Sequence, residues 1–311
     1  MWINKGLLLD IQKYVNDHIC SHASIPFAFN LRDNYFRIFF SSRNSSGKSL
    51  PFYVDTEIKN GEINIIDTIK GPLLNLGNPG TFDDSGIMSS SFVEHNNDLY
   101  MYYIGWNEEV LVPYKLSIGL AISKDGGNTF TKYSQGPIMD RSITEPYFNT
   151  APYVIKEKSK WKMWYISCSE WIIYDNKKEP VYTVKYTESK DGVNWVKKNI
   201  TSIKYSDKIE CVGRPCILKK KNKYEIYFSN RKSINYRKDK LSSYKISKSV
   251  SKNGKYWNDN FEIDILPYGQ LWDDKMREYC HVFIHENITY MIYNGNDFGK
   301  KGFGYSINKE N

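Results

Sequence analysis

An aromatic segment that ends in a small residue recurs five times along the 311-residue chain. The copies are Ile38-Phe39-Phe40-Ser41, Tyr102-Tyr103-Ile104-Gly105, Trp164-Tyr165-Ile166-Ser167, Ile226-Tyr227-Phe228-Ser229 and Ile292-Tyr293-Asn294-Gly295. Their final residues lie 64, 62, 62 and 66 positions apart, and one fifth of the chain is about 62 residues. A fixed period of this kind indicates a repeat architecture in which each copy is one supersecondary unit.

Each aromatic segment follows a polar turn and another apolar segment, which together predict a β-hairpin. In three repeats, at 123–130, 189–195 and 251–257, a third segment ends in a turn with Asp or Asn before Gly, which suits the positive φ of a tight turn. Four antiparallel strands repeated radially predict an all-β protein, a five-bladed β-propeller. Its inner strands are expected near 25–29, 87–93, 150–155, 214–218 and 280–284.

The last repeat stops after Phe303-Gly304-Tyr305-Ser306, before a complete fourth strand. The first 20 residues are therefore expected to supply that strand and close the ring. A solenoid is less suitable, because solenoid repeats run from about 20 to 45 residues and need polar caps. No linker divides the sequence, so residues 1–311 are expected to form one propeller domain.

The composition of the sequence indicates the cellular environment of the protein and the kinds of partner that it binds. The net charge of +8 comes from lysines spread along the chain, which argues against a nucleic-acid partner. No apolar run approaches the roughly 20 residues that span a bilayer, and Asp10 interrupts the only candidate signal segment. We therefore expect a cytoplasmic protein with no membrane partner. The odd number of cysteines and the lack of a C-x-x-C pair predict free thiols, without a metal or other cofactor: Cys20, Cys168, Cys211, Cys216 and Cys280.

Two of the strands, Tyr100-Met101-Tyr102-Tyr103 and Lys162-Met163-Trp164-Tyr165, with the Ser-Lys-Asp-Gly turns, resemble glycoside hydrolase families 43, 32, 68 and 130. More closely, the sequence resembles glycosidase-like propellers associated with bacterial surface-polysaccharide gene clusters. The resemblance covers about residues 24 to 306. It implies that the inner strands begin at the propeller axis and that acidic residues just before these starts form the catalytic set.

This placement selects Glu210, Asp84 and Glu145 as catalytic candidates. Glu210-Cys211 resembles the Glu-Cys motif that carries the general acid in family 32. Glycoside hydrolysis needs one protonated and one ionised carboxyl group, so Glu210 and Asp84 are expected to face each other across the axial funnel. Other readings are that Glu210 pairs with a surface lysine, that Asp84 binds its own turn, and that Glu145 binds hydroxyl groups or water.

Further residues near the strand starts are expected to bind substrate. Arginines at these positions suit a carboxylate or phosphate, although each could instead pair with a local acid. Histidines there could carry protons or be structural, and tryptophans could stack on a sugar or belong to the core. The candidates are Asp83, Arg141, Arg214, Asp273, Asp274, Arg277, Glu278, His22, Trp106 and Trp171, with His281 as a second histidine.

The sequence thus predicts a carbohydrate-active enzyme, a glycoside hydrolase acting on a sugar of a bacterial surface or capsular polysaccharide or on its precursor. The arginines favour an anionic or phosphorylated sugar. His18 and His22 stand where families 32, 43 and 68 place an aspartate, and this departure leaves a non-catalytic sugar-binding propeller open. A family 130-like phosphorylase, in which the arginines bind phosphate, is the other alternative.

Overall fold

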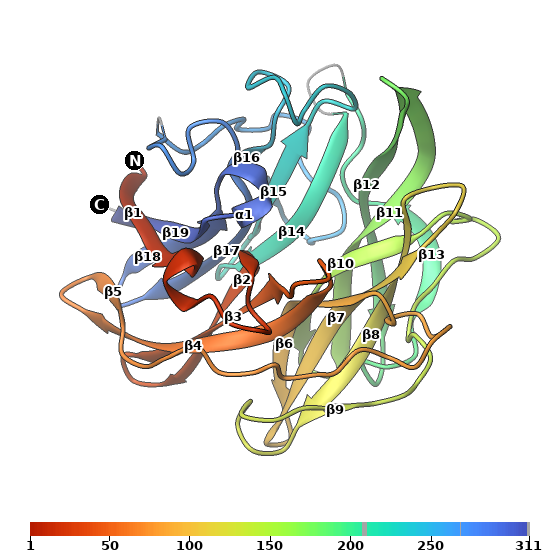
Figure 1. Ribbon diagram of the computed structural model, residues 1–311. Helices are drawn as coiled ribbons and strands as arrows, with labels where there is room; N and C mark the ends of the chain where they lie inside the picture. The colour runs from red at the N-terminus through yellow and green to blue at the C-terminus, as the bar shows by residue number, and fades with distance from the viewer. Residues whose placement is uncertain (207–209, 268, 310–311) are drawn as a thin grey trace.

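Five antiparallel β-sheets surround a central axis in the computed structural model, which describes residues 1–206, 210–267 and 269–309 (Figure 1). The predicted five-bladed β-propeller is therefore confirmed. The five predicted inner strands lie within β2, β6, β10, β14 and β17. From the axis outward, the first blade contains β2 (Ser21–Arg32), β3 (Tyr35–Arg43), β4 (Ser49–Lys59) and β5 (Glu62–Ile65), and the second contains β6 (Gly86–His95), β7 (Asp98–Glu108), β8 (Tyr114–Ser123) and β9 (Thr131–Lys132). The third blade contains β10 (Asn149–Glu157), β11 (Lys160–Tyr174), β12 (Lys177–Ser189) and β13 (Val196–Thr201), and the fourth contains β14 (Cys211–Lys219), β15 (Tyr224–Arg231) and β16 (Lys245–Ser251). The fifth blade contains β17 (Glu278–His285), β18 (Ile288–Asn294), β19 (Gly302–Lys309) and β1 (Ile3–Asp10).

The N-terminal strand closes the ring, as the incomplete last repeat predicts. β1 pairs antiparallel with β19, from Ile3 opposite Ile307 to Asp10 opposite Gly302. The two ends of the chain therefore share one sheet, which removes an open edge between the first and last blades. A short 3-10 helix, η1 (Ile11–Tyr14), follows β1, and a single helical turn, α1 (Asn296–Gly299), joins β18 to β19.

The fourth blade departs from the expected four strands. Its sheet contains β14, β15 and β16 only. The segment after β16 returns along that strand with a single bridge between Lys248 and Glu262 and a 3.0 Å hydrogen bond from Ile265 N to the Ile246 carbonyl. This segment follows the path of a fourth strand but does not form a regular ladder of backbone hydrogen bonds with β16.

In the second and fifth repeats, the glycine that closes the aromatic segment has a steric cause. In the second blade, a Cβ atom added at Gly105 would lie 2.4 Å from the ring of Phe82. In the fifth blade, a Cβ atom at Gly295 would lie 2.2 Å from the carbonyl oxygen of Trp272. Both distances are far below van der Waals contact, so the loop before each of these inner strands needs glycine to pack on the second strand.

Each inner strand contains a bulge near the axis, and the bulges build the floor of the central cavity. Ile25, Ala151 and Tyr279 adopt positive φ values of 56°, 46° and 53° at the irregular positions of β2, β10 and β17. Ser90 and Arg214 lie at the bulges of β6 and β14. Bulges bend a strand and redirect its side chains, so these five positions form a ring of non-repetitive backbone around the axis.

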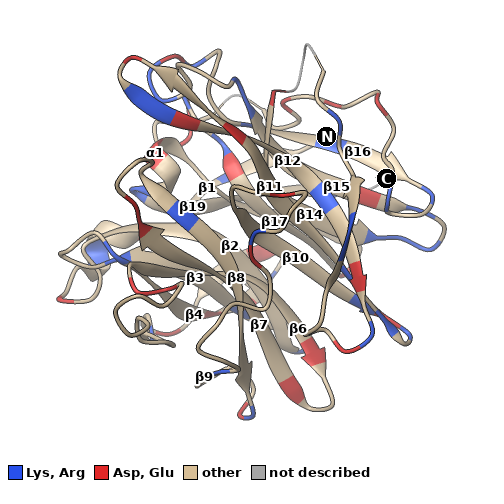
Figure 2. Cartoon of the chain, turned by 90° about the vertical axis from the view of Figure 1, so that its right-hand side faces the viewer, with Lys and Arg blue, Asp and Glu red and all other residues tan. Residues whose placement is uncertain are grey.

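Charged residues are spread over the blades, with Lys and Arg lying among Asp and Glu (Figure 2). The five cysteines are free thiols, and four of them are buried. Across the described ranges, no three His, Cys, Asp or Glu side chains are grouped closely enough to hold a metal ion. None of the helices in this part of the protein is long and apolar enough to cross a membrane.

Candidate active site

A cavity of about 250 Å³ occupies the axis and is lined by residues from all five blades. Ile25 comes from the first blade, Trp106 from the second, Ala151 from the third, Arg214 from the fourth and Tyr279 from the fifth. Much of the lining comes from the ends of second strands and the starts of third strands. The cavity is therefore associated with the face of the propeller on which the inner strands begin, called here the pocket face.

The wall of this cavity has an apolar side and a cationic, phenolic side. Blades two and three contribute the apolar groups, and blades one, four and five contribute most of the others. No Asp or Glu is among the described residues that line it. The apolar group is Met88, Ile104, Leu116, Phe148 and Ile166, and the polar group includes Arg43, Arg214, Arg231, Arg237, Tyr182, Tyr236, Tyr244 and Tyr279.

Arg231 is a fixed part of the wall. Its Nε donates to the hydroxyl groups of Tyr182 (3.2 Å) and Tyr244 (3.1 Å), which also hydrogen-bond to each other. Its Nη atoms donate to backbone carbonyls, including that of Pro180 at 2.8 Å. The guanidinium also lies 3.8 Å from the ring centre of Tyr236. A guanidinium held in this way places a permanent positive charge beside the cavity.

Two other arginines lie near the mouth and differ in their partners. Arg237 pairs with Glu179 at 3.2 Å and lies over the ring of Phe298. The Arg43 side chain makes no hydrogen bond or ion pair with any residue in the described ranges, although it is largely shielded from water. Burial lowers the pKa of Arg43, and the nearby charge of Arg237 lowers it further. The cavity therefore contains a guanidinium whose donors are free for an anion.

Glu278, the first residue of β17, is a buried carboxyl group beside this wall. Its side chain is fully buried, and neither oxygen has a hydrogen-bond partner among the described residues. Burial raises the pKa of Glu278 well above its usual value, and Arg237 and Arg231 only partly oppose this effect. Burial therefore favours the protonated form of Glu278, which is the form that a proton donor requires.

Glu210 has the opposite protonation state. Partial burial opposes its ionisation, but hydrogen bonds from Lys232 and Ser233 outweigh this effect and lower the pKa of Glu210 to about 2. The Lys232 Nζ lies 2.8 Å from one carboxylate oxygen, and the Ser233 N and Oγ lie 2.7 and 2.8 Å from the other. These donors favour the carboxylate form of Glu210, whereas the expected role as general acid requires the protonated form.

The comparisons with known proteins agree with this architecture. Residues 74–278 match the glycosyl hydrolases family 32 N-terminal domain. The chain is 31% identical over 291 residues to the uncharacterized protein Rv1502 of Mycobacterium tuberculosis, with 92% of each sequence covered. It is 30% identical over 141 residues to an invertase of Debaryomyces hansenii, a match that covers 42% of this chain and 24% of the invertase. A solved structure of a glycoside hydrolase superposes with a TM-score of 0.74 at 15% identity, over 99% of this chain and 92% of that one.

This protein belongs to glycosyl hydrolase family 32 through this N-terminal domain. A glycosidase built on a five-bladed propeller is thereby supported, in agreement with the resemblance seen in the sequence. The matched range includes Glu210-Cys211 and ends at Glu278, so both carboxyl groups described above lie within the family 32 region.

Three of the acidic candidates have equivalent structural positions in this family 32 domain. Each accepts a hydrogen bond from a tyrosine 20 residues later on the second strand of its blade. The pairs are Tyr103 to Asp83 (3.0 Å), Tyr165 to Glu145 (2.9 Å) and Tyr293 to Asp273 (2.8 Å). These contacts tie the loop before an inner strand to the second strand, and none of the three acids lines the axial cavity.

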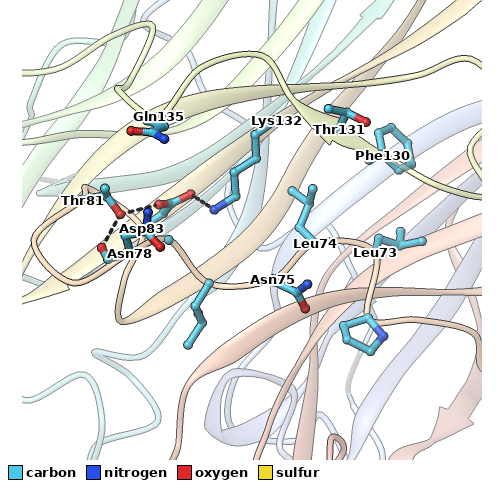
Figure 3. Close-up of a pocket in the computed structure, with 13 residues that line it drawn as sticks. Leu73, Leu74, Asn75, Asn78, Thr81, Asp83, Phe130, Thr131, Lys132 and Gln135 are labelled. Atoms are coloured by element: carbon cyan, nitrogen blue, oxygen red, sulfur yellow. Dashed lines mark hydrogen bonds and ion pairs between the residues drawn. The ribbon is translucent and has the colours of Figure 1, made fainter.

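The environment of Asp83 shows this role most clearly (Figure 3). Its carboxylate pairs with Lys132 of β9 at 2.7 Å and accepts from Thr81 at 3.2 Å. It faces a separate hollow of about 410 Å³ between the loop 72–83 and the segment 130–135. Glu145 is similarly enclosed, with Asn149, Lys185 and Lys197 around it. The expected catalytic position of Glu145 at the axis is corrected accordingly.

Asp84 binds its own turn, which was the alternative reading of this residue. It accepts from Gly80 N at 2.8 Å, Ser85 Oγ at 2.7 Å and Asn107 Nδ2 at 3.0 Å. Partial burial opposes ionisation, but these bonds lower the pKa of Asp84 overall. Neither Asp84 nor Glu210 is among the cavity-lining residues, so the expected facing pair across the axis is corrected.

Two of the arginine candidates and Asp274 also lie away from the cavity lining. Arg277 pairs with Asp264 at 2.7 Å and donates to the carbonyl of Leu266 at 3.1 Å. Arg141 is exposed, and Asp274 accepts from Asn296 at 2.7 Å. Of the three arginines predicted to bind an anion, Arg141, Arg214 and Arg277, only Arg214 lines the cavity. That side chain lies in the cavity floor, with its Nε buried and lacking a partner among the described residues.

The histidines and tryptophans divide between structural and cavity positions. His281 stacks on Phe27 at 3.8 Å and accepts from Ala28 N, which is a structural role. Burial and the charge of Arg43 lower the pKa of His22 to about 4, so it is neutral near pH 7. Trp106 lines the cavity and its indole N–H has no partner in the described part of the protein. Trp171 packs against Tyr114 and Phe148, behind the lining.

Sequence reasoning missed Arg43, Arg231 and Arg237. A signal for the first two was present, because each follows the closing small residue of its aromatic segment by two positions, Ser41 and Ser229. Inner strands begin on the pocket face and second strands end on it, because the two are antiparallel neighbours. Arg237 lies in the loop between β15 and β16, where no periodic feature marks it.

Proposed function

We propose that the protein is a glycoside hydrolase that binds an anionic sugar, with a carboxylate or phosphate group, in the axial cavity. The observation that carries this proposal is Arg43, a partly buried guanidinium in the cavity wall without a counter-ion among the described residues. Arg231 adds positive charge on the same side, whereas the charge of Arg237 is paired with Glu179 behind the lining. An anionic substrate group would satisfy Arg43 and offset the cost of its burial.

Sugar rings have apolar faces and polar edges, and the cavity offers a surface for each. Met88, Leu116 and Phe148 form an apolar wall on which a ring face could rest. The unpaired indole N–H of Trp106 is a donor for a hydroxyl oxygen. This division of the wall supports a single sugar unit, held by its charged group at one side and by packing at the other.

The two carboxyl groups proposed for the reaction are Glu278 and Glu210. Both stand behind the lining of the cavity, so the proposed reaction needs the glycosidic bond to reach past the wall. Glu278, whose protonated form is favoured by burial, would donate its proton to the glycosidic oxygen as the bond to the anomeric carbon breaks. Glu210 is ionised and would accept a proton from the attacking water. When the environments of two carboxyl groups move their pKa values apart, the group with the higher pKa acts as the acid and the other as the base. Burial raises the pKa of Glu278, and hydrogen bonds lower that of Glu210.

The proposed source of the substrate is a bacterial surface or capsular polysaccharide or its precursor, which the sequence resemblance supports. The free thiols support a reducing, cytoplasmic location, where a precursor would be met. A phosphorylase is the second candidate. Arg43 favours it specifically, because the same guanidinium could bind inorganic phosphate as the attacking group in place of water.

A panel of oligosaccharides with neutral, carboxylated and phosphorylated sugars tests the proposal, with and without inorganic phosphate. New reducing ends from anionic members alone would support hydrolysis, and sugar phosphates formed only with phosphate would support the phosphorylase. Glu278→Gln and Glu210→Gln should each lower kcat by at least about 100-fold. Glu94→Gln, an exposed residue on the opposite face, is the control. Equal turnover of neutral sugars, or full activity of Glu278→Gln, would contradict the proposal.

A further inference from the structure

The most exposed aliphatic side chains of the described residues share one face of the propeller. Apart from Met1, six large aliphatic side chains are more than three-quarters exposed, from Ile173 at 76% to Ile143 at 102%. Each belongs to a segment at the end where inner strands begin: the turns between second and third strands, or the loops before β10 and β17. All six therefore lie on the pocket face: Val110, Leu111, Ile143, Ile173, Leu241 and Leu271.

The opposite face has no such residues among its described turns. The hairpins between first and second strands turn at Asp33-Asn34, Asn96-Asn97 and Glu286-Asn287, and the remaining two turn through lysine and serine or asparagine. The third-strand turns are built on Asp125, Asp191 and Asn253. The most exposed aliphatic groups are therefore distributed unevenly between the two faces.

Exposed cations accompany the aliphatic groups on the same segments. Within 109–113, 141–148, 173–178, 232–244, 269–276 and 296–301, the exposed acids are Glu109, Asp175 and Asp297. The exposed basic residues of these segments outnumber them and are Arg141, Lys177, Arg237, Lys238, Lys240, Lys275, Lys300 and Lys301. These segments of the pocket face are therefore both apolar at their tips and positively charged.

The tips on three neighbouring blades are tied to one another. Lys178, at the start of β12, donates to the carbonyl oxygen of Leu111 in the loop after β7. Lys238, in the loop after β15, pairs with Asp175 at 2.9 Å. The hairpin of β11 and β12 thus lies between the two other loops and is bonded to both. These contacts present Val110, Leu111 and Ile173 as one surface.

We propose that, against the expectation of no membrane partner drawn from the composition, the pocket face binds the surface of an anionic lipid bilayer. The aliphatic tips would enter the headgroup region, and the lysines and arginines would lie among anionic headgroups. The aliphatic groups stand on separate loops with cations between them, whereas the centre of a protein interface is a continuous packed patch depleted of charge. This pattern favours a lipid surface over a second copy of the protein or a different protein partner.

Binding in this orientation would turn the axial cavity toward the bilayer. A groove of about 430 Å³ beside Val110 and Lys177 shares Tyr114 and Arg237 with the axial cavity. A sugar attached to a membrane component could therefore reach the cavity without leaving the surface. The lipid inference itself rests on the surface residues alone and does not depend on the proposed hydrolysis.

Vesicle co-sedimentation of the full-length protein tests the inference, with phosphatidylcholine vesicles that contain or lack phosphatidylglycerol. The protein should sediment with the anionic vesicles, and less so as salt is raised. The triple change Val110→Ser, Leu111→Ser and Ile173→Ser should weaken this binding at least about tenfold. The matched control is Tyr133→Ser, Val196→Ser and Tyr256→Ser, which changes three exposed apolar residues outside the pocket-face segments.

Three results would overturn the inference. The first is a wild-type protein that stays in the supernatant with anionic vesicles at low salt. The second is equal sedimentation of the triple variant and its control, both of which should keep the wild-type circular dichroism spectrum. The third is a stable dimer, seen by sedimentation equilibrium, that only the pocket-face triple variant dissociates, since the occupant would then be a second copy. None of these results depends on turnover, so they are separate from a failure of the proposed function.

Discussion

Arg214 donates a 2.8 Å hydrogen bond from its guanidinium to the carbonyl oxygen of Ser90, 124 positions away in the sequence. The other Nη atom donates to the carbonyls of Tyr279 (3.0 Å) and Cys280 (2.8 Å). One fully buried side chain of the fourth blade therefore joins the inner strands of the second and fifth blades. The carbonyls that it satisfies are those left unpaired by the bulges near the axis.

Replacing Arg214 should destabilise the whole propeller. Arg214→Met removes the donors for three backbone carbonyls at the axis, and we expect a loss of about 3 to 5 kcal/mol in the free energy of unfolding. Urea denaturation followed by tryptophan fluorescence measures it. Arg141→Met, at an exposed arginine, should change stability by less than about 0.5 kcal/mol. Similar stabilities for the two variants would show that the axial bonds contribute little.

Arg43 should control the affinity of the cavity for anions. Arg43→Gln removes the unpaired guanidinium, and we expect phosphate or sulfate binding to weaken at least about tenfold. In a thermal shift titration, phosphate should raise the melting temperature of the wild type more than that of the variant. Arg141→Gln is the charge-matched control. Identical titrations for all three proteins would argue against an anion site at Arg43.

Glu278 should make stability depend on pH in a defined direction. Its pKa is raised in the folded state, so the protonated form is favoured by folding. The folded state is then most stabilised below the unfolded pKa, about 4.3, and stability falls as pH rises toward the folded pKa, by at most about 1.4 kcal/mol per pH unit. Glu278→Gln should remove this slope. Urea unfolding of both proteins between pH 5 and 8 measures the difference, and parallel curves would contradict a neutral Glu278.

The closing glycine of the second repeat should not tolerate a methyl group. Gly105→Ala places a Cβ atom 2.4 Å from the Phe82 ring, and we expect a loss of about 1 to 3 kcal/mol from overpacking. Gly136→Ala is the control, because nothing lies within 4 Å of the corresponding Cβ position. Differential scanning calorimetry should show a lower melting temperature for Gly105→Ala alone. An unchanged melting temperature would mean that the loop carrying Phe82 can move away.

The sequence by itself determined the number of blades, the inner strands and the closure of the ring by β1. These features depend on local patterns, since hydrophobic alternation, Asp-Gly or Asn-Gly turns and a small residue after each aromatic segment act within one repeat. The repeat also marked the acids before the inner strands, and Asp83, Glu145 and Asp273 do occupy equivalent positions. Their equivalence in the sequence reflects a structural bond to a tyrosine on the second strand.

Only the tertiary structure decided which side chains reach the axis and which carboxyl group keeps a proton. Arg43 and Arg231 are 188 positions apart in the sequence and line one cavity because the ring brings the first and fourth blades together. Glu210 and Glu278 each stand at or just before an inner strand, yet lysine and serine donors favour the ionised form of the first while burial favours the protonated form of the second. The burial of a side chain and its hydrogen-bond partners depend on contacts between blades, so a pattern that repeats within each blade does not encode them.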